Sequence, residues 1–579
     1  MIKVDHLSYS FPQKELFHDI SFTIEDGQHC ALIGTSGSGK STLLEILMDP
    51  ERYLYDGVIE TDPDCRIGYV SQFSALDETK DMTVFEYIAS DFIRLQNELA
   101  SIYIEMETST DMDALLERYQ IVLDAYQAIG GDDYEQNIRK QLNLANLGKH
   151  EQLMVSKLSG GEFKIIQVIK ELLHSPDLMI MDEPDVFLDF ENLNSLKNLI
   201  NSHKGTVLVI THNRYLLHHC FDKILHLENM ELQEFDGNYI NYNFTLLLKK
   251  IELQELATAD ALELERNEKL IHKLRADADI FTDASRGKAL KARIKIKERL
   301  EARRIKAPFV EIRQPDIRLV SEPELEETAI LTLKDYSLAF DDTLLEEVSF
   351  ELNSHDKVAF IGPNGTGKTT LLRDIYKNTH EAIQIHEAAK VAYLSQNNSE
   401  ILNETNTILR EFLDAGFQTN QEVAEHLLKY GFGEEYLSQK LGSLSGGEKN
   451  LLQIAKIASA NANLLLLDEP TSHLDTYSQI ALERAISEYN GSVLMVSHDF
   501  YTIVNCVDYV FLIEDKSIRR MSIRKFRKMI YEKHFGKDYL EIEQKVKAAE
   551  LKIAVALKDS DFTLARELSE ELEELIKLL

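Results

Sequence analysis

Two stretches of the same kind decide the fold: GTSGSGKST at Gly34–Thr42 and GPNGTGKTT at Gly362–Thr370. Both match G-x-x-x-x-G-K-[ST], a pattern in which glycines let backbone N–H groups curl around phosphate, the Lys supplies a positive charge and the hydroxyl binds Mg²⁺. Each stretch follows an apolar run and precedes a Leu-rich segment, which is the strand–loop–helix context of a phosphate loop. Since about 0.02 matches per chain are expected by chance, the sequence predicts two such loops.

Four more motifs follow each phosphate loop in the same order. The first copy has GYVSQ ending at Gln72, LSGGE at Leu158–Glu162, LMIMDEP at Leu178–Pro184 and VITH ending at His212; the second has AYLSQ ending at Gln396, LSGGE at Leu444–Glu448, LLLLDEP at Leu464–Pro470 and MVSH ending at His498. From LSGGE to the histidine the copies are 286 residues apart throughout, whereas the glutamines are 324 apart. The first copy therefore holds about 38 additional residues before LSGGE, and we predict two packed helices at about 94–129, where apolar residues recur at helical spacing.

The repeated polar residues suit phosphate chemistry. Asp182 and Asp468 end apolar strands and are candidate Mg²⁺ ligands, and the adjacent Glu183 and Glu469 are candidates to polarise an attacking water. LSGGE places a Ser and two Gly at the start of a helix, where backbone donors suit an anion. Taken singly, an acid or a histidine at a strand end is an ordinary structural residue. The identical spacing in both copies favours the functional interpretation.

The composition is that of a soluble folded protein. The chain has 579 residues, 44% hydrophobic and 28% charged, which predicts about three to five domains. The sequence has no membrane-length apolar run and no signal-peptide pattern, so we expect a cytoplasmic protein. The four cysteines are far apart, which argues against a zinc site or a disulfide framework.

Charge confines nucleic-acid contact to one element. The net charge is −35, which repels a polyanion from most of the surface. The stretch from Arg286 to Lys306, however, holds ten basic and two acidic residues, a balance that favours a salt-sensitive contact with an RNA backbone. A solvated, charged coiled coil remains the alternative.

A long helical hairpin carries this stretch. A seam of mostly apolar positions stepping by four and three runs from Leu246 to Phe281, and predicts a helix from about Tyr242 to Asp279. A returning helix follows, with its apolar stripe at Ala289, Ala292, Ile296 and Leu300 and its basic residues facing outward. The turn is expected at about 280–285.

These motifs resemble those of the ATP-binding cassette superfamily. The fused cassettes, the insertion in the first copy only and the charged connector resemble its ABC-F subfamily, as do DGNYINY at Asp236–Tyr242 and SRGKALKARIK at Ser285–Lys295. The resemblance implies an α/β fold with two P-loop ATP-binding cassette domains in tandem, joined by an α-helical hairpin linker and followed by a C-terminal helical hairpin. We expect a first cassette at 1–242 with a helical arm insertion at about 94–129, a linker at 243–308, a second cassette at 309–536 and a C-terminal extension at 537–579.

The resemblance further implies a head-to-tail sandwich in which LSGGE of one copy closes the ATP site of the other. It assigns catalysis to Glu183, Glu469, His212 and His498, and Mg²⁺ to Ser41, Gln72, Asp182, Thr369, Gln396 and Asp468. The implied ATP contacts are Phe11, Gly34, Ser36, Gly37, Gly39, Lys40, Ser41 and Thr42; Phe340, Gly362, Asn364, Gly365, Gly367, Lys368, Thr369 and Thr370; Ser159, Gly160, Gly161 and Glu162; and Ser445, Gly446, Gly447 and Glu448. Arg286, Lys288, Lys291, Arg293 and Lys295 are the candidate RNA contacts.

ABC-F proteins are translation factors or antibiotic-resistance factors, so the resemblance implies an ATPase using ATP and Mg²⁺. It would act as a monomer without a membrane, binding the ribosomal E site in its ATP-bound state and reaching rRNA, P-site tRNA and the peptidyl-transferase centre through its linker. We expect ribosome protection against antibiotics slightly ahead of a housekeeping role. A fused ATPase subunit of a transporter explains the motifs equally well but not the basic connector. A DNA-repair or chromosome ATPase would need zinc-finger insertions or a longer coiled coil.

One departure concerns the loop after the paired acids. The family pattern DEPTNHLD is nearly kept in the second copy, DEPTSHLD at Asp468–Asp475, but the first reads DEPDVFLD at Asp182–Asp189. The added acid and two apolar residues put equal turnover at the two sites in doubt.

Overall fold

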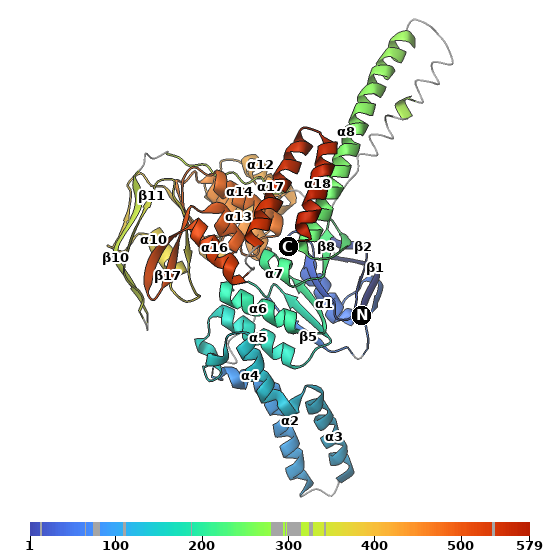
Figure 1. Ribbon diagram of the computed structural model, residues 1–579, viewed down its shortest axis with the longest axis vertical. Helices are drawn as coiled ribbons and strands as arrows, with labels where there is room; N and C mark the ends of the chain where they lie inside the picture. The colour runs from blue at the N-terminus through green and yellow to red at the C-terminus, as the bar shows by residue number, and fades with distance from the viewer. Residues whose placement is uncertain are drawn as a thin grey trace. The chain divides into compact units, whose positions relative to one another are not determined.

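The computed structural model describes residues 1–578 except 12–13, 64, 73–80, 108–111, 187, 279–292, 296, 298–313, 324–327, 341–342 and 535–538 (Figure 1). It divides into two compact units, Met1–Asn238 with Arg313–Arg527, and Tyr239–Ile312 with Lys528–Leu579. Both motif copies belong to the first unit. The second unit combines the linker with the C-terminal helices.

Each copy is built on a six-stranded sheet of mainly parallel strands. The first has the order β5(Ile67–Val70), β6(Leu178–Asp182), β7(Thr206–Ile210), β3(His29–Ile33), β8(Lys223–Glu228), β9(Glu231–Asp236). The second has β14(Val391–Leu394), β15(Leu464–Asp468), β16(Ser492–Val496), β12(Lys357–Ile361), β17(Tyr509–Glu514), β18(Ser517–Ser522). Only the last strand of each is antiparallel to its neighbour. The central strands are continuous apolar runs because helices bury both faces of a parallel sheet.

A three-stranded antiparallel sheet accompanies each large sheet. The first consists of β2(Lys14–Ile24), β1(Ile2–Phe11) and β4(Asp56–Glu60), and the second of β11(Thr343–Asn353), β10(Ala329–Ala339) and β13(Ile383–Ile385). In each copy one hydrophobic core joins the two sheets and the helix that follows the phosphate loop, α1(Lys40–Met48) or α10(Lys368–Lys377). This core holds the phosphate loop at the carboxyl edge of the parallel strands, where ligands bind in open α/β sheets.

The remaining helices of the first unit follow the same duplication. The first copy has α4(Tyr134–Leu144), α5(Gly160–Leu173), α6(Phe190–Ser202) and α7(Arg214–His219); the second has α11(Ile408–Asp414), α12(Asn420–Leu428), α13(Gly446–Ser459), α14(Thr476–Glu488) and α15(Phe500–Cys506). The next helix, α16(Ile523–His534), begins in the first unit and continues into the second. α5 and α13 begin with the Ser of LSGGE as N-cap, whose side chain accepts from the backbone of the Glu three residues on while that Glu bonds back. This capping box explains why the motif starts a helix at that point.

The arm of the first copy contains two packed helices, α2(Val84–Met106) and α3(Met112–Ala128). They are joined by a hydrogen bond of 2.8 Å from Gln96 Nε2 to Tyr126 Oη and an ion pair of 3.1 Å between Arg118 and Glu98. α2 begins ten residues before the predicted start at 94, because Thr83 and Glu86 form a capping box that fixes the helix start there.

The second unit contains α8(Tyr239–Ala278), α17(Tyr539–Lys558) and α18(Phe562–Ile576), which bury a common core around Ile251, Ile553 and Leu572. The returning linker helix is described only at Arg293–Lys295 and Lys297, which are helical. Arg293 Nη1 donates to Asn267 Oδ1 on α8 at 2.8 Å. Its guanidinium is therefore directed at the neighbouring helix, which corrects the expectation that it faces outward, whereas Lys295 is exposed. Arg286, Lys288, Lys291 and the expected tip at 280–285 lie outside the described residues. None of the described helices is both long and apolar enough to cross a membrane.

Candidate functional site

The two phosphate loops have the same internal geometry. Lys40 Nζ donates to the carbonyl oxygens of Gly34 and Thr35 at 2.9 and 3.0 Å. Lys368 Nζ donates to the carbonyl oxygens of Gly362 and Pro363 at 2.8 and 2.7 Å. Both ammonium groups are thus buried inside a loop of backbone, and burial lowers the pKa of both lysines. Each loop therefore holds the positive charge of its lysine at the position where a bound phosphate would lie.

Glycine is required where each loop enters its helix. Gly39 has φ 99° and Gly367 has φ 89°, in the left-handed region. A Cβ at Gly39 would lie 2.8 Å from the Phe17 ring, and one at Gly367 would lie 2.6 Å from Leu338. Any side chain at these positions would therefore collide with the core beneath the loop.

The paired acids stand at the carboxyl ends of β6 and β15. Ser41 hydrogen-bonds to Asp182, and Thr369 Oγ1 donates to Asp468 Oδ1 at 3.0 Å. Burial, and for Asp182 also Glu183, raises the pKa of each aspartate to about 6. One oxygen of each aspartate is buried without a hydrogen-bond partner among the described residues.

These donors fit Mg²⁺. A hydroxyl, a carboxylate with a free oxygen and a nearby glutamine make an all-oxygen ligand set of the kind Mg²⁺ prefers. Burying an ionised carboxylate oxygen costs free energy when no donor or cation replaces its water. A bound Mg²⁺ would supply that replacement for Asp182 and Asp468. The predicted metal ligands therefore occupy positions suited to their predicted role.

Both candidate catalytic glutamates have the same unusual backbone. Glu183 has φ 45° and Glu469 has φ 47°, values rare for residues other than glycine. Each conformation is held by a hydrogen bond of 2.9 Å from its amide to the next strand, at Ile210 and Val496 respectively. Strain repeated at equivalent positions is typical of functional residues that the surrounding fold constrains.

The side chains of these glutamates have different surroundings. Glu183 Oε2 accepts from Gln72 Nε2 at 2.7 Å and lies 3.1 Å from His473 Nδ1 of the other copy. Burial raises its pKa, but the hydrogen bond and charge of His473, with His212 and Lys40, outweigh burial and lower it overall. Glu183 is thus held ionised at neutral pH.

Glu469 is held differently. Its Oε2 accepts from the backbone N–H of His498 at 3.2 Å, and its Oε1 is buried without a hydrogen-bond partner among the described residues. Burial, and then the neighbouring Asp468, raises its pKa to about 8. Glu469 is therefore mostly protonated at neutral pH in this state.

The two predicted histidines are neutral. Burial, and then the adjacent phosphate-loop lysine, lowers the pKa of His212 to about 4 and that of His498 to about 3. His498 Nε2 lies 3.6 Å from Glu469 Oε1. Each neutral ring lies near enough to its loop lysine for the lysine charge to affect its pKa, and a neutral ring could hydrogen-bond to phosphate without adding charge.

The copies meet head to tail within the first unit, as the resemblance implies. Ser36 Oγ donates to the His473 carbonyl oxygen at 3.5 Å, and a Cβ at Gly447 would lie 2.3 Å from Ser36 Oγ. The Glu448 carboxylate would lie 3.3 Å from a Cβ at Gly37. LSGGE of the second copy thus lies against the first phosphate loop.

The second site is an open cavity of about 500 Å³. LSGGE of the first copy and the second phosphate loop line it together, through Ser159, Gly160, Gly161, Asn364, Gly365, Gly367, Lys368, Thr369 and Thr370, with Phe340, Gln396, Glu469 and His498. Asn364 N donates to Asp189 Oδ2 of the first copy at 3.1 Å. Phe340 is 69% exposed at this cavity. Phe11 packs edge-on against Tyr9 and is half exposed.

Three contacts were not predicted from the sequence. His473 contacts Glu183 of the other copy, and Asp189 accepts from the Asn364 amide of the other copy. Glu228 accepts from the Thr35 amide and hydroxyl at 3.1 and 3.0 Å. Asp189 and its counterpart Asp475 also cap α6 and α14. Their identical 286-residue spacing was an available signal.

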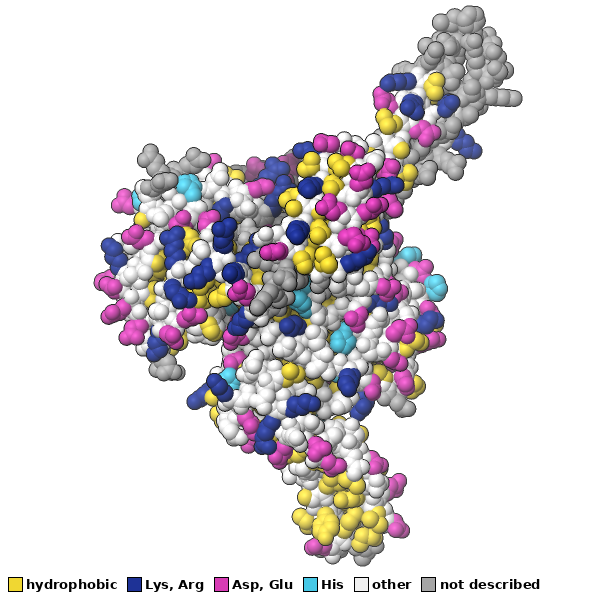
Figure 2. Space-filling view, in the orientation of Figure 1, with side chains coloured by type: hydrophobic (Ala, Val, Ile, Leu, Met, Phe, Trp, Pro, Cys, Tyr) yellow, Lys and Arg dark blue, Asp and Glu magenta, His cyan; other side chains and the backbone are white. Residues whose placement is uncertain are grey.

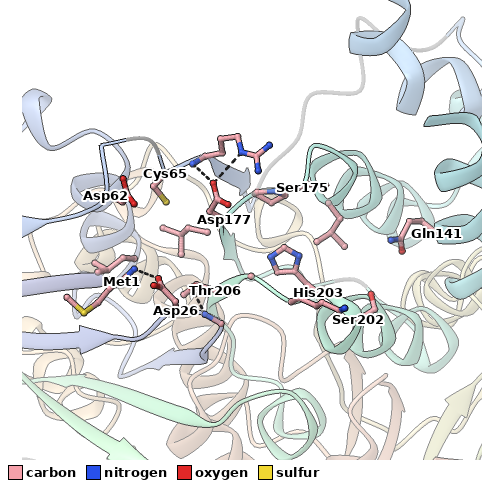
Figure 3. A pocket seen from close by; sticks show the side chains of 18 residues that line it. Met1, Asp26, Asp62, Cys65, Gln141, Ser175, Asp177, Ser202, His203 and Thr206 are labelled. Atoms are coloured by element: carbon pink, nitrogen blue, oxygen red, sulfur yellow. Dashed lines mark hydrogen bonds and ion pairs between the residues drawn. The ribbon is translucent and has the colours of Figure 1, made fainter. Parts of the chain in front are cut away.

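A larger cavity of about 690 Å³ lies at the opposite, amino-terminal ends of β6 and β7 (Figure 3). Asp177 accepts from Arg66 Nε at 3.3 Å, and Asp26 pairs with the Met1 amino group. Because these charged groups pair with one another, we assign this cavity no chemistry despite its volume.

The chain is similar in sequence to known proteins over most of its length. The model of the family described as ABC transporter matches residues 17–186 and 345–472. The "Uncharacterized ABC transporter ATP-binding protein YfmM" of Bacillus subtilis is 28% identical over 532 residues, covering 86% of this chain and 96% of its own. "ABC transporter F family member 5" of Arabidopsis thaliana is 29% identical, covering 89% and 75%. The "Energy-dependent translational throttle protein EttA" of Escherichia coli is 28% identical, covering 87% and 90%.

Among solved structures, one titled "RNase-L Inhibitor" matches with a TM-score of 0.53 at 17% identity, covering 92% of both chains. This likeness confirms the fold of two cassettes in tandem. With the duplicated motifs and the family match over both copies, the chain belongs to the ABC-F family of ATP-binding proteins, and its two ABC cassettes hydrolyse ATP.

Proposed function

We propose that this protein is a ribosome-binding ABC-F translation factor that acts as a monomer in the cytoplasm. It binds the ribosomal E site with ATP in both sites, acts on P-site tRNA and the peptidyl-transferase centre through its linker, and leaves after hydrolysis. The observation that supports it best is the head-to-tail packing of LSGGE against the opposite phosphate loop, in a chain that also carries a long basic hairpin. The relative named as a translational throttle protein supports the ribosomal part.

ATP acts as the switch in this proposal. The nucleotide favours the closed form only if it binds that form more tightly than the open one. Residues that approach each site from the opposite copy, such as Glu448 at the first and Asp189 at the second, provide that difference. Closure is therefore coupled to occupancy of both sites.

Hydrolysis in this proposal uses residues of both phosphate loops and of the strands beside them. Lys40 and Lys368 neutralise phosphate charge, and Glu183 and Glu469 orient a water for in-line attack on the γ-phosphate. Asp182 with Ser41 and Gln72, and Asp468 with Thr369 and Gln396, would hold Mg²⁺, which supplies further charge neutralisation. In the present state Gln72 donates its amide to Glu183, so its oxygen remains available for that role.

The linker begins with a long helix. α8 has 40 residues, which corresponds to about 60 Å at 1.5 Å per residue. Lys295 on the returning helix is exposed, and Arg286, Lys288 and Lys291 are the further proposed RNA contacts.

The test is ribosome co-sedimentation of the Glu183→Gln/Glu469→Gln variant with ATP. We expect stronger retention than for wild type, because hydrolysis no longer releases the closed form. Lys40→Ala/Lys368→Ala is the matched control and should not respond to ATP. Equal retention of the glutamine variant and wild type would refute the switch.

Protection of the ribosome against antibiotics is a more specific role that a ribosome-binding ABC-F protein could have. The short arm and the α17–α18 hairpin are compatible with it, and the relatives' names do not favour it over a housekeeping role. Minimum inhibitory concentrations of phenicols, oxazolidinones, lincosamides, pleuromutilins and macrolides, with and without expression, separate the two. Unchanged values for every drug would leave the housekeeping role. Recovery of the protein in the membrane fraction would instead support a transporter subunit.

A further inference from the structure

A second basic element lies at the end of the second cassette. From Ser517 to Arg527 the chain has five basic residues, Arg519, Arg520, Arg524, Lys525 and Arg527, and no acidic one. In a protein with a net charge of −35, such a stretch stands out as much as the linker does. It is far from the linker in sequence and belongs to the other structural unit.

The structure places four of these side chains on the surface. Arg519 and Arg520 lie on β18, the edge strand of the second sheet, and Arg524 and Lys525 on the first turn of α16. All four are exposed, and we call them the basic patch. Figure 2 shows dark blue side chains gathered over the region that Figure 1 labels α16.

The charges of the basic patch are weakly compensated. Arg519 lies 3.6 Å from Glu514, but both side chains are mostly exposed, and such pairs contribute little. Arg520 stacks on the Tyr509 ring at 3.6 Å, which orients its guanidinium without neutralising it. Arg524 and Lys525 form no ion pair with any residue that the structure describes.

The first cassette shows that the fold does not need these charges. β9 pairs with β8 in the same register as β18 with β17, and each equivalent residue is 286 positions earlier. The basic patch corresponds there to Gln233, Glu234, Asn238 and Tyr239, and β9 adds Glu231 and Asp236. The same backbone therefore carries opposite charge in the two cassettes.

We propose that the basic patch is a second RNA-binding surface, which holds a phosphate backbone independently of the linker. Three of its four side chains are Arg, whose planar donors match phosphate oxygens in pairs. Met521 lies between the residues of the basic patch and Phe526 directly follows them, and both are buried, so neither can serve as the inserted apolar anchor that membrane-surface helices use. The proposal rests on the proposed function for the source of the RNA, which is the ribosome.

The test compares two full-length variants with the same change in net charge. The patch variant carries Arg519→Gln, Arg520→Gln, Arg524→Gln and Lys525→Gln. The control carries Lys140→Gln, Lys204→Gln, Lys377→Gln and Lys390→Gln, all exposed lysines elsewhere in the cassettes. Equal melting temperatures and ATPase rates show that both fold.

Binding to a fluorescein-labelled RNA hairpin is measured by anisotropy over a series of KCl concentrations, without ATP. We expect the patch variant to bind about 10-fold more weakly at low salt, with a slope of log K against log salt reduced by about 2 to 3. The control should stay within about twofold of wild type. Wild type that ignores the hairpin, or a patch variant that matches the control, would overturn the proposal.

Two further arms separate the explanations. Flotation with phosphatidylcholine–phosphatidylserine vesicles that depends on the patch, without an effect on RNA, would assign the patch to lipid and overturn the proposal. Ribosome co-sedimentation tests the proposed function separately. If ATP does not strengthen it while hairpin binding still depends on the patch, the switch fails and the basic patch stands.

Discussion

The two cassettes share the backbone geometry around Glu183 and Glu469, but the charged and polar groups around these two side chains differ. Both glutamates stand at strained positions after equivalent strands. Glu183 contacts the side chains of Gln72 and His473, whereas the carboxylate of Glu469 accepts a backbone N–H from His498 and lies 3.6 Å from the ring of the same residue. The pKa of Glu183 is lowered and that of Glu469 is raised to about 8. Duplication has thus kept the backbone geometry of these glutamates while changing which of them is ionised at neutral pH.

The loop after the glutamates extends this contrast. Asp185 of the first copy occupies the position of Thr471, and its Oδ1 accepts from Thr211 Oγ1 at 2.7 Å. Lys164, which occupies the position of Asn450, donates to the Gln72 carbonyl oxygen at 3.2 Å. Two uncharged residues of the second copy, Thr471 and Asn450, are therefore replaced in the first by two ionisable ones, Asp185 and Lys164.

The largest expected effect is on the contact between the copies. Arg214 of the first copy is only 9% exposed and pairs with Glu483 and with Asp499, the latter at 2.9 Å; its counterpart is the apolar Phe500. Arg214→Met would leave the buried Glu483 and the partly buried Asp499 without their cation and should destabilise the first unit by about 3 to 5 kcal/mol. Thermal melting measures this, and Arg484→Met, at an exposed arginine, is the control. Equal melting of the two variants would contradict the importance of the pair.

The second largest effect is a difference in ATPase activity between the single variants of the two glutamates. Glu183→Gln should lower steady-state phosphate release by about 100-fold and Glu469→Gln by no more than about tenfold, because removing a positioned base costs two to four orders of magnitude at the site that uses it. ATP binding should be unchanged in both variants. Equal losses would mean that the sites turn over alike.

The third effect is on the pH dependence of stability and concerns Asp185, which the second copy replaces with Thr471. Burial raises its pKa from 3.8 to about 7, so between these values the folded protein keeps a proton that the unfolded chain has released. Stability therefore falls as pH rises through this window. Asp185→Asn removes the loss and should be more stable than wild type at pH 8 by on the order of 2 kcal/mol, with a small difference near pH 4. A difference in melting that does not change with pH would contradict the protonated carboxyl.

The smallest effect concerns His473. His473→Ala should lower kcat about fivefold with little change in KM, since the ring orients Glu183 rather than binding nucleotide. His473→Gln, which can still donate a hydrogen bond, should recover most of the loss. A change in KM alone would place His473 in nucleotide binding.

The sequence was sufficient for the elements that each copy builds alone. Phosphate loops, paired acids and helix-starting LSGGE are local patterns, and their repeated spacing revealed the duplication. The start of α2 at Val84 was missed although Thr83 and Glu86 form a readable capping box. The contact between His473 and Glu183, and the direction of Arg293, depend on how distant segments dock, for which the local sequence carries no pattern.

The shared composition of each ATP site is tested most directly by combining Ser445→Arg with either glutamate variant in ATPase assays. The account predicts that Ser445→Arg adds little to Glu183→Gln, since both change the first site, but removes most of the activity left by Glu469→Gln. The reverse pattern would place LSGGE of the second copy at its own phosphate loop and contradict the head-to-tail arrangement.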